Sequence, residues 1–263
     1  MKLDLVIHSV DDNPYYTDFW PMVSKVWKLR FGIDPILIHI TDGSVELSEE
    51  FGPVVKIKKI DNIPIHIQAQ MARFWYPQFL PDSIWMTSDI DMFPISRTHF
   101  ITDLEQYDDN VWMNLNNQSD YFPVCYNIAK GSLFKSVLEM SEDFEEFLEQ
   151  VKCDLGIDDW NQTTVDGSDL QTHCPENQND SFVNWCFDEM YIGKKINSFR
   201  DQTDLVLTPS RPDGFPNGRR INRTSWVYDE ALIDNDFYID CHSVRPYHIY
   251  KEEVDRLVGR LLS

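Results

Sequence analysis

The spacing of apolar residues over the first hundred positions predicts strands and helices in alternation. Apolar runs of strand length predict strands at residues 3–10, 35–40, 54–60 and 83–92. Apolar residues at helical spacing predict a helix over 19–30, closed by Gly32, and another that begins at residue 67 and ends near Pro77. Strands that alternate with helices are typical of a doubly wound, largely parallel sheet.

The pattern becomes less regular after residue 102. Further strands are predicted at 111–115, 124–129, 205–207 and 237–240, and further helices at 131–151, 182–192 and 254–262. Polar residues at 152–180 predict a long surface excursion, and Pro, Gly and Arg residues at 209–224 predict a loop. We therefore expect one α/β domain over 1–263, with a mixed, mostly parallel central sheet flanked by helices.

The composition agrees with one folded unit and restricts its ligands. Of 263 residues, 42% are hydrophobic and 13% aromatic, which is enough to form a large core. The 44 acidic residues outnumber the 23 Lys and Arg residues and leave a net charge of −21. Such a surface repels nucleic acid and anionic membranes, so binding to either is disfavoured. It also repels a diphosphate-bearing ligand unless a cation bridges the two.

Cysteines and targeting signals exclude several classes of protein. The five cysteines form no C-x-x-C pair, so neither a zinc site nor a disulfide framework is predicted. The apolar run near the start contains Asp4, which is atypical of a signal peptide. No stretch approaches the roughly 18 apolar residues of a membrane span. From these features we expect a cytoplasmic protein without a membrane-spanning segment.

Two D-x-D patterns occur, D-I-D at 89–91 and D-N-D at 234–236. The first closes an apolar strand, and doubly wound sheets bind ligands at the carboxyl ends of their strands. In an extended strand both carboxylates lie on one face, where they repel each other unless a cation or a ligand compensates. This arrangement predicts Asp91 as the direct ligand of a divalent cation, with Asp89 acting through water or a ligand hydroxyl. The alternative is a pair of acids that only form hydrogen bonds at a strand end.

A second candidate site lies in the sequence D-C-H-S-V-R-P-Y-H at 240–248. His242 follows a predicted strand and would add a nitrogen ligand to the carboxylates, a donor set that favours Mn²⁺ over Mg²⁺. Arg245 can bind phosphate oxygens through two N–H groups at once. The alternative for His242 is a structural histidine with satisfied hydrogen bonds.

Six short motifs follow one another along most of the chain. They are D-L-V-I-H-S-V-D-D-N-P-Y-Y at 4–16, M-A-R-F-W-Y-P at 71–77, S-D-I-D-M-F-P at 88–94, V-C-Y-N-I-A-K-G at 124–131, W-C-F-D-E at 185–189 and H-S-V-R-P-Y at 242–247. Together they resemble the metal-dependent nucleotide-sugar glycosyltransferases of the GT-A (Rossmann-like) fold, including the small glycosyltransferase domains of large algal DNA viruses. The last motif is similar to the H-x-x-G-x-x-K-P-W of glycogenin-like enzymes, with Arg245 in place of the lysine and a shorter spacing.

The resemblance implies that residues 1–102 bind a nucleoside-diphosphate sugar. It implies that 103–263 bind the acceptor and contribute the C-terminal metal and diphosphate segment. The donor-binding residues that it implies are Ser9, Val10, Asp11, Arg73, Ser88, Asp89, Asn127 and Arg245. Of these, residues 9–11 would contact the nucleoside, Arg73 the donor sugar or Asp89, and Asn127 the sugar. The alternatives are an ordinary capped strand-to-helix turn at 9–11 and a surface arginine at position 73.

The W-C-F-D-E motif resembles the element that lies beside the acceptor in this family. A transfer that inverts the anomeric carbon needs a carboxylate to take the proton of the attacking hydroxyl. Asp188 is predicted as this base, with Glu189 as a structural or acceptor-orienting partner, because neighbours on a helix point about 100° apart. The alternative is a pair of acids on a helix surface. Retaining enzymes of this fold also carry a D-x-D, so the assignment of the base applies to inversion.

The sequence therefore predicts transfer of a sugar from a nucleoside-diphosphate donor, preferably a UDP-sugar, to a hydroxyl of a glycan acceptor, with Mn²⁺ or Mg²⁺ as cofactor. A sugar nucleotidyltransferase typically has a Gly-rich basic loop after its first strand. This chain has D-D-N-P at 11–14 instead, which argues against that class. A HAD-type phosphatase has its D-x-D after the first strand. In this chain the pair lies at 89–91, after a later strand, which argues against a phosphatase. A non-catalytic nucleotide-sugar-binding or carbohydrate-binding protein is a further alternative.

Overall fold

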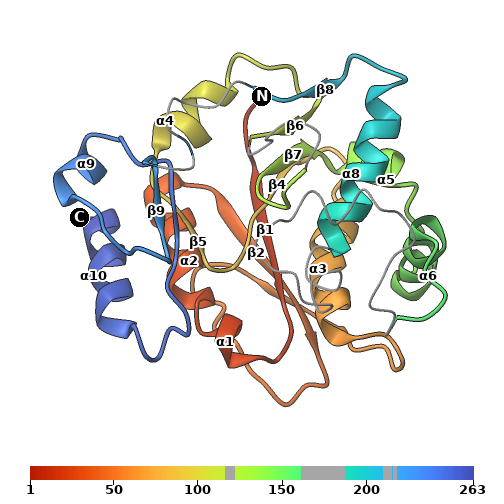
Figure 1. The fold of residues 1–263 in the computed structure, drawn as a ribbon, viewed down its shortest axis with the longest axis horizontal. Coiled ribbons are helices and arrows are strands. Elements are labelled where there is room, and N and C mark those ends of the chain that lie inside the picture. Colours follow the sequence, from red (N-terminus) through yellow and green to blue (C-terminus); the bar gives the residue numbers. More distant parts are fainter. Residues whose placement is uncertain (116–121, 161–186, 210–214, 216–217) are drawn as a thin grey trace.

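A computed structural model describes the chain over residues 1–115, 122–160, 187–209, 215 and 218–263. Its centre is a seven-stranded sheet in the order β3-β2-β1-β4-β7-β6-β8 (Figure 1). The strands are β1 (Leu5–Val10), β2 (Asp34–Thr41), β3 (Val54–Lys58), β4 (Ile84–Thr87), β6 (Trp112–Asn114), β7 (Asn127–Lys130) and β8 (Val206–Leu207). Only β7 runs antiparallel to its neighbours, so the predicted mixed, mostly parallel sheet is confirmed.

Helices cover both faces of this sheet (Figure 1). One side carries α3 (Ile65–Trp75), α5 (Gly131–Leu138), α6 (Phe144–Leu155) and α8 (Phe187–Arg200). The other side carries α2 (Trp20–Val26), its π-helical extension η1 (Trp27–Phe31) and α10 (Lys251–Leu262). Alternation along the strands makes this possible, because Val6 packs into the core on the α2 side and Ile7 into the core on the α3 side.

Short elements complete the described chain. They are α1 (Pro14–Thr17), η2 (Tyr76–Phe79), α4 (Arg97–Phe100), η3 (Thr102–Leu104) and α9 (Glu230–Asp234). The predicted helix over 19–30 is confirmed as α2 and η1, and Gly32 ends it in the left-handed conformation with a φ of +71°. Within the described ranges, no helix combines the length and apolarity that crossing a membrane requires.

A second, three-stranded sheet lies on the side of the large sheet that carries α2 and α10, and it brings the end of the chain to the D-x-D (Figure 1). It consists of β5 (Met92–Pro94), β10 (Asp240–His242) and β9 (Arg220–Asn222), in the order β5-β10-β9. β10 pairs antiparallel to β5, with His242 opposite Met92, and parallel to β9, with His242 opposite Asn222. A backbone hydrogen bond from the Ser243 N–H to the Asp91 carbonyl, at 2.9 Å, continues this pairing. Residues 89–91 and 242–245 are therefore held side by side.

Several predicted elements differ from the structure; the strands predicted over 237–240 and 124–129 are shifted along the chain to β10 and β7. The strand over 83–92 is two strands, β4 and β5, separated by a turn, so the argument that alternation places Asp89 and Asp91 on one strand face is wrong. The helix over 131–151 is divided into α5 and α6, because the chain turns left-handed at Glu139 and Asp143 caps a new helix. The loop over 209–224 contains strand β9. Residues 161–180, in the predicted excursion, and 182–186, in the predicted helix, lie outside the described ranges.

Candidate active site

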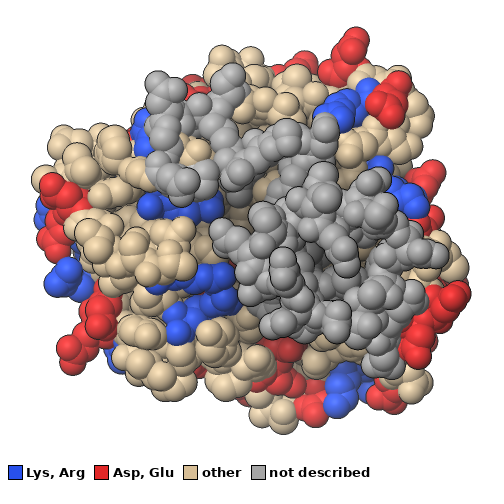
Figure 2. Space-filling model, in the orientation of Figure 1, with Lys and Arg blue, Asp and Glu red and all other residues tan. Residues whose placement is uncertain are grey.

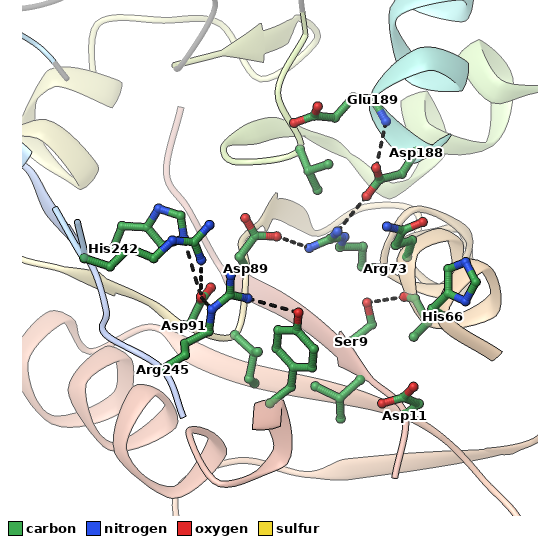
Figure 3. A pocket seen from close by; sticks show the side chains of 17 residues that line it. Ser9, Asp11, His66, Arg73, Asp89, Asp91, Asp188, Glu189, His242 and Arg245 are labelled. Atoms are coloured by element: carbon green, nitrogen blue, oxygen red, sulfur yellow. Dashed lines mark hydrogen bonds and ion pairs between the residues drawn. The ribbon is translucent and has the colours of Figure 1, made fainter. Parts of the chain in front are cut away.

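A pocket opens at the carboxyl ends of β1 and β4, where a doubly wound sheet binds its ligands (Figure 3). Its wall is drawn from β1, α1, α3, the turn after β4, the start of α8 and the segment that follows β9 and β10. The lining residues are Ser9, Val10, Asp11, Tyr16, His66, Ala69, Gln70, Arg73, Asp89, Ile90, Asp91, Val124, Asp188, Glu189, Arg223, His242 and Arg245. The pocket thus collects side chains from both halves of the chain.

Arg73 joins two of the acids. It projects from α3 and is 7% exposed. Its Nη1 donates to Asp89 Oδ1 at 2.5 Å and its Nη2 donates to Asp188 Oδ2 at 2.7 Å (Figure 3). A buried guanidinium is compensated here by two carboxylates, which is the pairing that burial of a charge requires. Arg73 therefore lies in the pocket wall, and the surface arginine that was the alternative at this position is wrong.

The Asp188 carboxyl lies at the first turn of α8, and its Oδ1 accepts a hydrogen bond from the Glu189 N–H at 2.9 Å. It is 2% exposed. Burial raises the pKa of this carboxyl to about 6, although Arg73 acts in the opposite direction, and the nearby Asp89 adds to the increase. A carboxyl with such a pKa exchanges a proton near neutral pH, as a general base must. The alternative reading of Asp188 as a helix-surface acid is wrong.

Cys125 holds Asp89 from the opposite side. The Cys125 thiol donates to Asp89 Oδ2 at 3.0 Å, and the Asp89 N–H donates to Cys125 Sγ at 3.2 Å. Burial, and then the adjacent Asp89 carboxylate, raise the pKa of the thiol well above its usual range, so the thiol keeps its proton. Both oxygens of Asp89 are therefore engaged, one by Arg73 and the other by Cys125.

Asp91 is surrounded by basic side chains instead. Its Oδ2 lies 3.4 Å from His242 Nε2, 3.3 Å from Arg245 Nε and 3.4 Å from Arg223 Nη1 (Figure 3). Burial tends to raise the pKa of this carboxyl, but His242, and after it the two arginines, outweigh burial and hold the pKa well below its usual range. Asp91 is thus ionised at neutral pH, and the positive charge around it exceeds its own negative charge.

Arg245 is itself fixed by the aromatic residues of α1. Its guanidinium lies 5.2 Å from the ring centroid of Tyr15 and 5.3 Å from that of Tyr16. Its Nη1 also donates to the Tyr16 hydroxyl at 3.0 Å. These contacts connect the first strand-to-helix turn with the segment after β10, so the two ends of the chain form one corner of the pocket.

The predicted nucleoside-binding residues lie at the other end of the pocket. Ser9, Val10 and Asp11 end β1, and the Ser9 hydroxyl donates to the Ala69 carbonyl of α3. His66 lies nearby, and burial lowers the pKa of its imidazole, which keeps it neutral at pH 7. This end therefore offers neutral hydrogen-bonding groups and one carboxylate, whereas the Asp91 end offers cations.

Two predicted donor-binding residues do not line the pocket. The Asn127 side chain is fully buried, accepts from Trp112 Nε1 and Asn114 Nδ2, and donates to the carbonyls of Pro123 and Val124. Its amide is occupied in the core, which contradicts the predicted contact with a sugar. Ser88 is also fully buried, with its N–H on the Ile7 carbonyl, so its role is the connection of the turn to β1.

Sequence reasoning missed several lining residues. Tyr16, His66, Gln70 and Val124 were not predicted as site residues, and Arg223 was counted only as part of a loop. Val124 and Cys125 precede Asn127 by three and two positions in a motif that had been noticed, so the motif was found but its pocket-lining position was not chosen. Nothing in the local sequence distinguishes Arg223 from its neighbours Arg219 and Arg220.

The second D-x-D has a structural role. Asp236 accepts hydrogen bonds from the Ser96 hydroxyl and from the N–H groups of Arg97 and Thr98, at the start of α4. Asp234 is on the surface and pairs with Arg260. Neither lines the pocket, so these acids differ from those at 89–91 in environment although the local pattern is the same.

The metal-ligating atoms at Asp91 and His242 suit a divalent cation that is held mainly by the phosphate groups of a bound substrate. Asp91 Oδ2 and His242 Nε2 lie 3.4 Å apart and both face the pocket, and one carboxylate oxygen with one imidazole suits Mn²⁺. Among the described residues, no group of three or more His, Cys, Asp or Glu side chains is arranged to hold a metal. Phosphate-bound cations commonly take one or two protein ligands and complete their shell with phosphate oxygens and water. The two residues are sufficient for such a cation.

Basic side chains are spread unevenly over this acidic molecule. Figure 2 shows several Lys and Arg side chains left of the centre of the face, in the region where Figure 1 places β9, while others lie at the rim among Asp and Glu side chains. The pocket itself is lined by more Asp and Glu than Arg side chains, so positive charge is in excess only in the corner where Arg223 and Arg245 face Asp91. An anionic ligand would meet positive charge in that corner.

Comparisons with known proteins give matches to structures only. No family model matches the chain, and no curated protein matches it. Glycosyltransferase GlyE of Streptococcus pneumoniae TIGR4 in its apo form matches at 13% identity and a TM-score of 0.46, covering 100% of this chain and 62% of GlyE. A glycosyltransferase involved in the glycosylation of the major capsid of PBCV-1 matches at 9% identity and a TM-score of 0.41, covering 97% of this chain and 98% of that one.

The galactosyltransferase LgtC in complex with donor and acceptor sugar analogues matches at 14% identity and a TM-score of 0.46, covering 99% of this chain and 97% of LgtC. This chain thus spans less than two thirds of GlyE but nearly the whole of the other two proteins. At these identities and TM-scores the likeness by itself establishes no activity, so a function for this chain must be argued from its pocket.

Proposed function

We propose that this protein is a metal-dependent glycosyltransferase that moves a sugar from a nucleoside-diphosphate donor, preferably a UDP-sugar, to a hydroxyl of a glycan acceptor. One observation carries the proposal. A single pocket holds the cationic corner around Asp91, which suits a diphosphate, and the Arg73-bound Asp188, a buried carboxyl whose pKa of about 6 suits a base. The two features lie on opposite sides of Asp89 (Figure 3).

The cationic corner would receive the diphosphate. Asp91 and His242 would hold Mn²⁺ or Mg²⁺, with Asp89 assisting through water or a sugar hydroxyl, and Arg245 would bind phosphate oxygens directly. The bound cation supplies Lewis-acid stabilisation of the departing diphosphate. Negative charge that develops on the leaving group is then met by groups already in place, which is how preorganised sites lower a barrier.

With the diphosphate in the cationic corner, the nucleoside and the acceptor would each lie against a different part of the pocket wall. Ser9, Val10 and Asp11 would contact the nucleoside, where the backbone pairs with a base edge and the carboxylate suits a ribose hydroxyl. In the inverting mechanism, Asp188 takes the proton of the acceptor hydroxyl while that oxygen attacks the anomeric carbon. Glu189, the next residue of α8, would orient the acceptor.

Hydrolysis and transfer assays test this function. The wild type should release UDP from a UDP-sugar in Mn²⁺, and EDTA should abolish the release. Asp91→Asn should lower kcat/KM by about 100-fold or more, because it replaces the carboxylate that would hold the cation against the leaving diphosphate. Asp234→Asn, which changes an exposed acid of the second D-x-D, is the matched control and should keep wild-type activity. Undiminished turnover in EDTA would show that the reaction needs no divalent metal. Wild-type activity of Asp91→Asn would show that Asp91 does not belong to the active site.

A further inference from the structure

We propose that Arg223 and Arg245 together form an anion site that binds the donor's diphosphate without a divalent cation. The inference rests on the proposed function and extends it. The cation would then contribute to the departure of the diphosphate, whereas a substantial part of nucleotide affinity would come from the two arginines. Arg223 would supply the second positive charge that lets this pocket bind a diphosphate without a metal.

The first support is the geometry around Asp91. Arg245 Nε and Arg223 Nη1 lie 3.3 and 3.4 Å from the same oxygen, Oδ2 of Asp91. Charge-assisted N–H···O bonds are usually about 2.7–2.9 Å long, so both contacts are loose. A guanidinium carries five N–H donors, and one long contact to Asp91 leaves most of the capacity of Arg223 unused by that acid. Arg223 is therefore attracted to Asp91 but not saturated by it.

The second support is the balance of charge. Asp91 contributes one negative charge, and two guanidiniums face it, so this corner carries an excess of positive charge even with His242 neutral. Asp89 is bound to Arg73, which it shares with Asp188, so the excess of positive charge is local to Asp91 and its two arginines. Each arginine also disfavours the charge of the other. An oxyanion with several acceptor oxygens between the two guanidiniums would relieve that repulsion and form bidentate contacts.

The third support is that Arg223 lies on a fixed backbone. It directly follows β9, whose last residue Asn222 is paired with His242 in β10. The Asn222 side chain then accepts from the N–H and the hydroxyl of Thr224 at 3.0 and 2.9 Å, which forms a turn around Arg223. Arg223 is 30% exposed at its side chain, so it is reachable by a ligand in the pocket. A residue held in this way binds with little loss of backbone conformational entropy.

Two probes distinguish binding of the diphosphate from binding of the nucleoside. UDP carries the diphosphate, whereas uridine offers the same nucleoside without it. Binding of each to the full chain is measured by calorimetry, once in Mn²⁺ and once in EDTA. We expect UDP to bind in both conditions and uridine to bind at least tenfold more weakly than UDP in EDTA, because uridine cannot reach the arginines with a charged group.

Arg223→Ala should weaken UDP binding in EDTA by about tenfold, since one set of charge-assisted hydrogen bonds is lost. Arg219→Ala is the matched control: it removes the same charge four positions earlier from a side chain that contacts Phe237 outside the pocket, and UDP should bind to it as to the wild type. Circular dichroism of each variant establishes that it is folded.

The remaining outcomes decide between this inference and the function beneath it. Binding of UDP in Mn²⁺ but not in EDTA would overturn the inference and leave the metal-dependent transferase standing. An equal loss in Arg219→Ala and Arg223→Ala would also overturn it, because only general charge would then matter. Absence of UDP binding under both conditions would reject the proposed function itself.

Discussion

Arg73 shows how much of this site depends on one buried side chain. It is held between Asp89, in the turn after β4, and Asp188, at the start of α8. The two acids belong to opposite ends of the proposed reaction, the donor side and the acceptor side. A shift of this guanidinium would therefore move both at once, which makes Arg73 a positioning residue for each of them.

The pKa of Asp188 predicts how activity depends on pH. Its carboxyl has a pKa of about 6, above the usual value, so it is protonated below that pH and then cannot accept the proton of the acceptor. The transfer rate should accordingly fall as the pH drops below about 6 and level off above about 7. A profile of kcat/KM between pH 5 and 8 measures this, and a rate that is independent of pH throughout would contradict the assignment.

The same base can be tested by substitution. Asp188→Asn keeps the size of the side chain and should lower kcat by about 100- to 10,000-fold, because the proton acceptor is lost. Glu189→Gln is the comparison on the adjacent position and should raise the KM for the acceptor with a smaller effect on kcat. If the Asn variant kept more than a tenth of the wild-type rate, Asp188 would not be the base.

Cys125 gives a further test at the level of single atoms. Cys125→Ala removes the thiol that donates to Asp89 and should raise the KM for the donor by about threefold to tenfold, the effect of losing one hydrogen bond. Cys125→Ser keeps a donor in the same place and should restore most of the loss. Equal effects of the two substitutions would indicate that the residue acts only by filling space.

At the level of elements, the site depends on close approaches between secondary structures. Gly131 starts α5 directly after β7, and its N–H donates to the Ser83 carbonyl at the start of β4. A Cβ at this position would lie 2.2 Å from the Pro77 carbonyl oxygen and 2.5 Å from that of Leu80. The junction of β7 and α5 therefore requires glycine because of the backbone that packs against it.

Two glycine substitutions should change stability in opposite directions. Gly131→Ala should lower the free energy of unfolding by about 1–3 kcal/mol, because the backbone of η2 must shift. Gly259→Ala lies in α10 with nothing within 4 Å of the added Cβ and should raise stability by about 0.5–1 kcal/mol through helix propensity. Urea unfolding measures both. The packing argument fails if Gly131→Ala is as stable as the wild type.

At the level of the whole molecule, charge is distributed unevenly. A net charge of −21 destabilises the compact state through self-repulsion, while Asp89, Asp91 and Asp188 in the pocket are paired with arginine or histidine. The repulsion therefore comes chiefly from the exposed acids at the periphery (Figure 2). These charges are open to screening by salt, unlike the buried pairs.

Salt should accordingly stabilise this protein. Raising NaCl from 10 to about 200 mM shortens the Debye length to less than about 10 Å and weakens repulsion between distant surface acids. The melting temperature should rise by a few degrees at pH 7.5, and surface ion pairs, each worth little, should not reverse the trend. An equal concentration of a neutral osmolyte controls for effects unrelated to charge. A fall in melting temperature with salt would show that attractive pairs dominate.

Much of the site was accessible from local pattern. Asp89, Asp91, His242 and Arg245 were chosen because chemically suitable side chains follow predicted strands, and the pocket brings them together although β4 and β10 belong to different sheets. The error at Asn127 arose because a local motif does not specify which side chain faces the pocket and which is buried. The turn between β4 and β5 was missed because strand-forming residues lie on both sides of it, so the whole segment was interpreted as one strand.

The sequence by itself determined the strand and helix alternation, the mixed sheet and the chemical identity of most pocket residues. These properties are local, because apolar periodicity and side-chain chemistry are written over a few neighbouring positions. Only the tertiary structure decided that Arg73 bridges Asp89 and Asp188 and that Arg223 joins Asp91. Those partners are separated by up to 132 positions, and their meeting depends on how β9, β10 and α8 pack against the sheet. Such packing is a property of the whole chain, and no short segment encodes it.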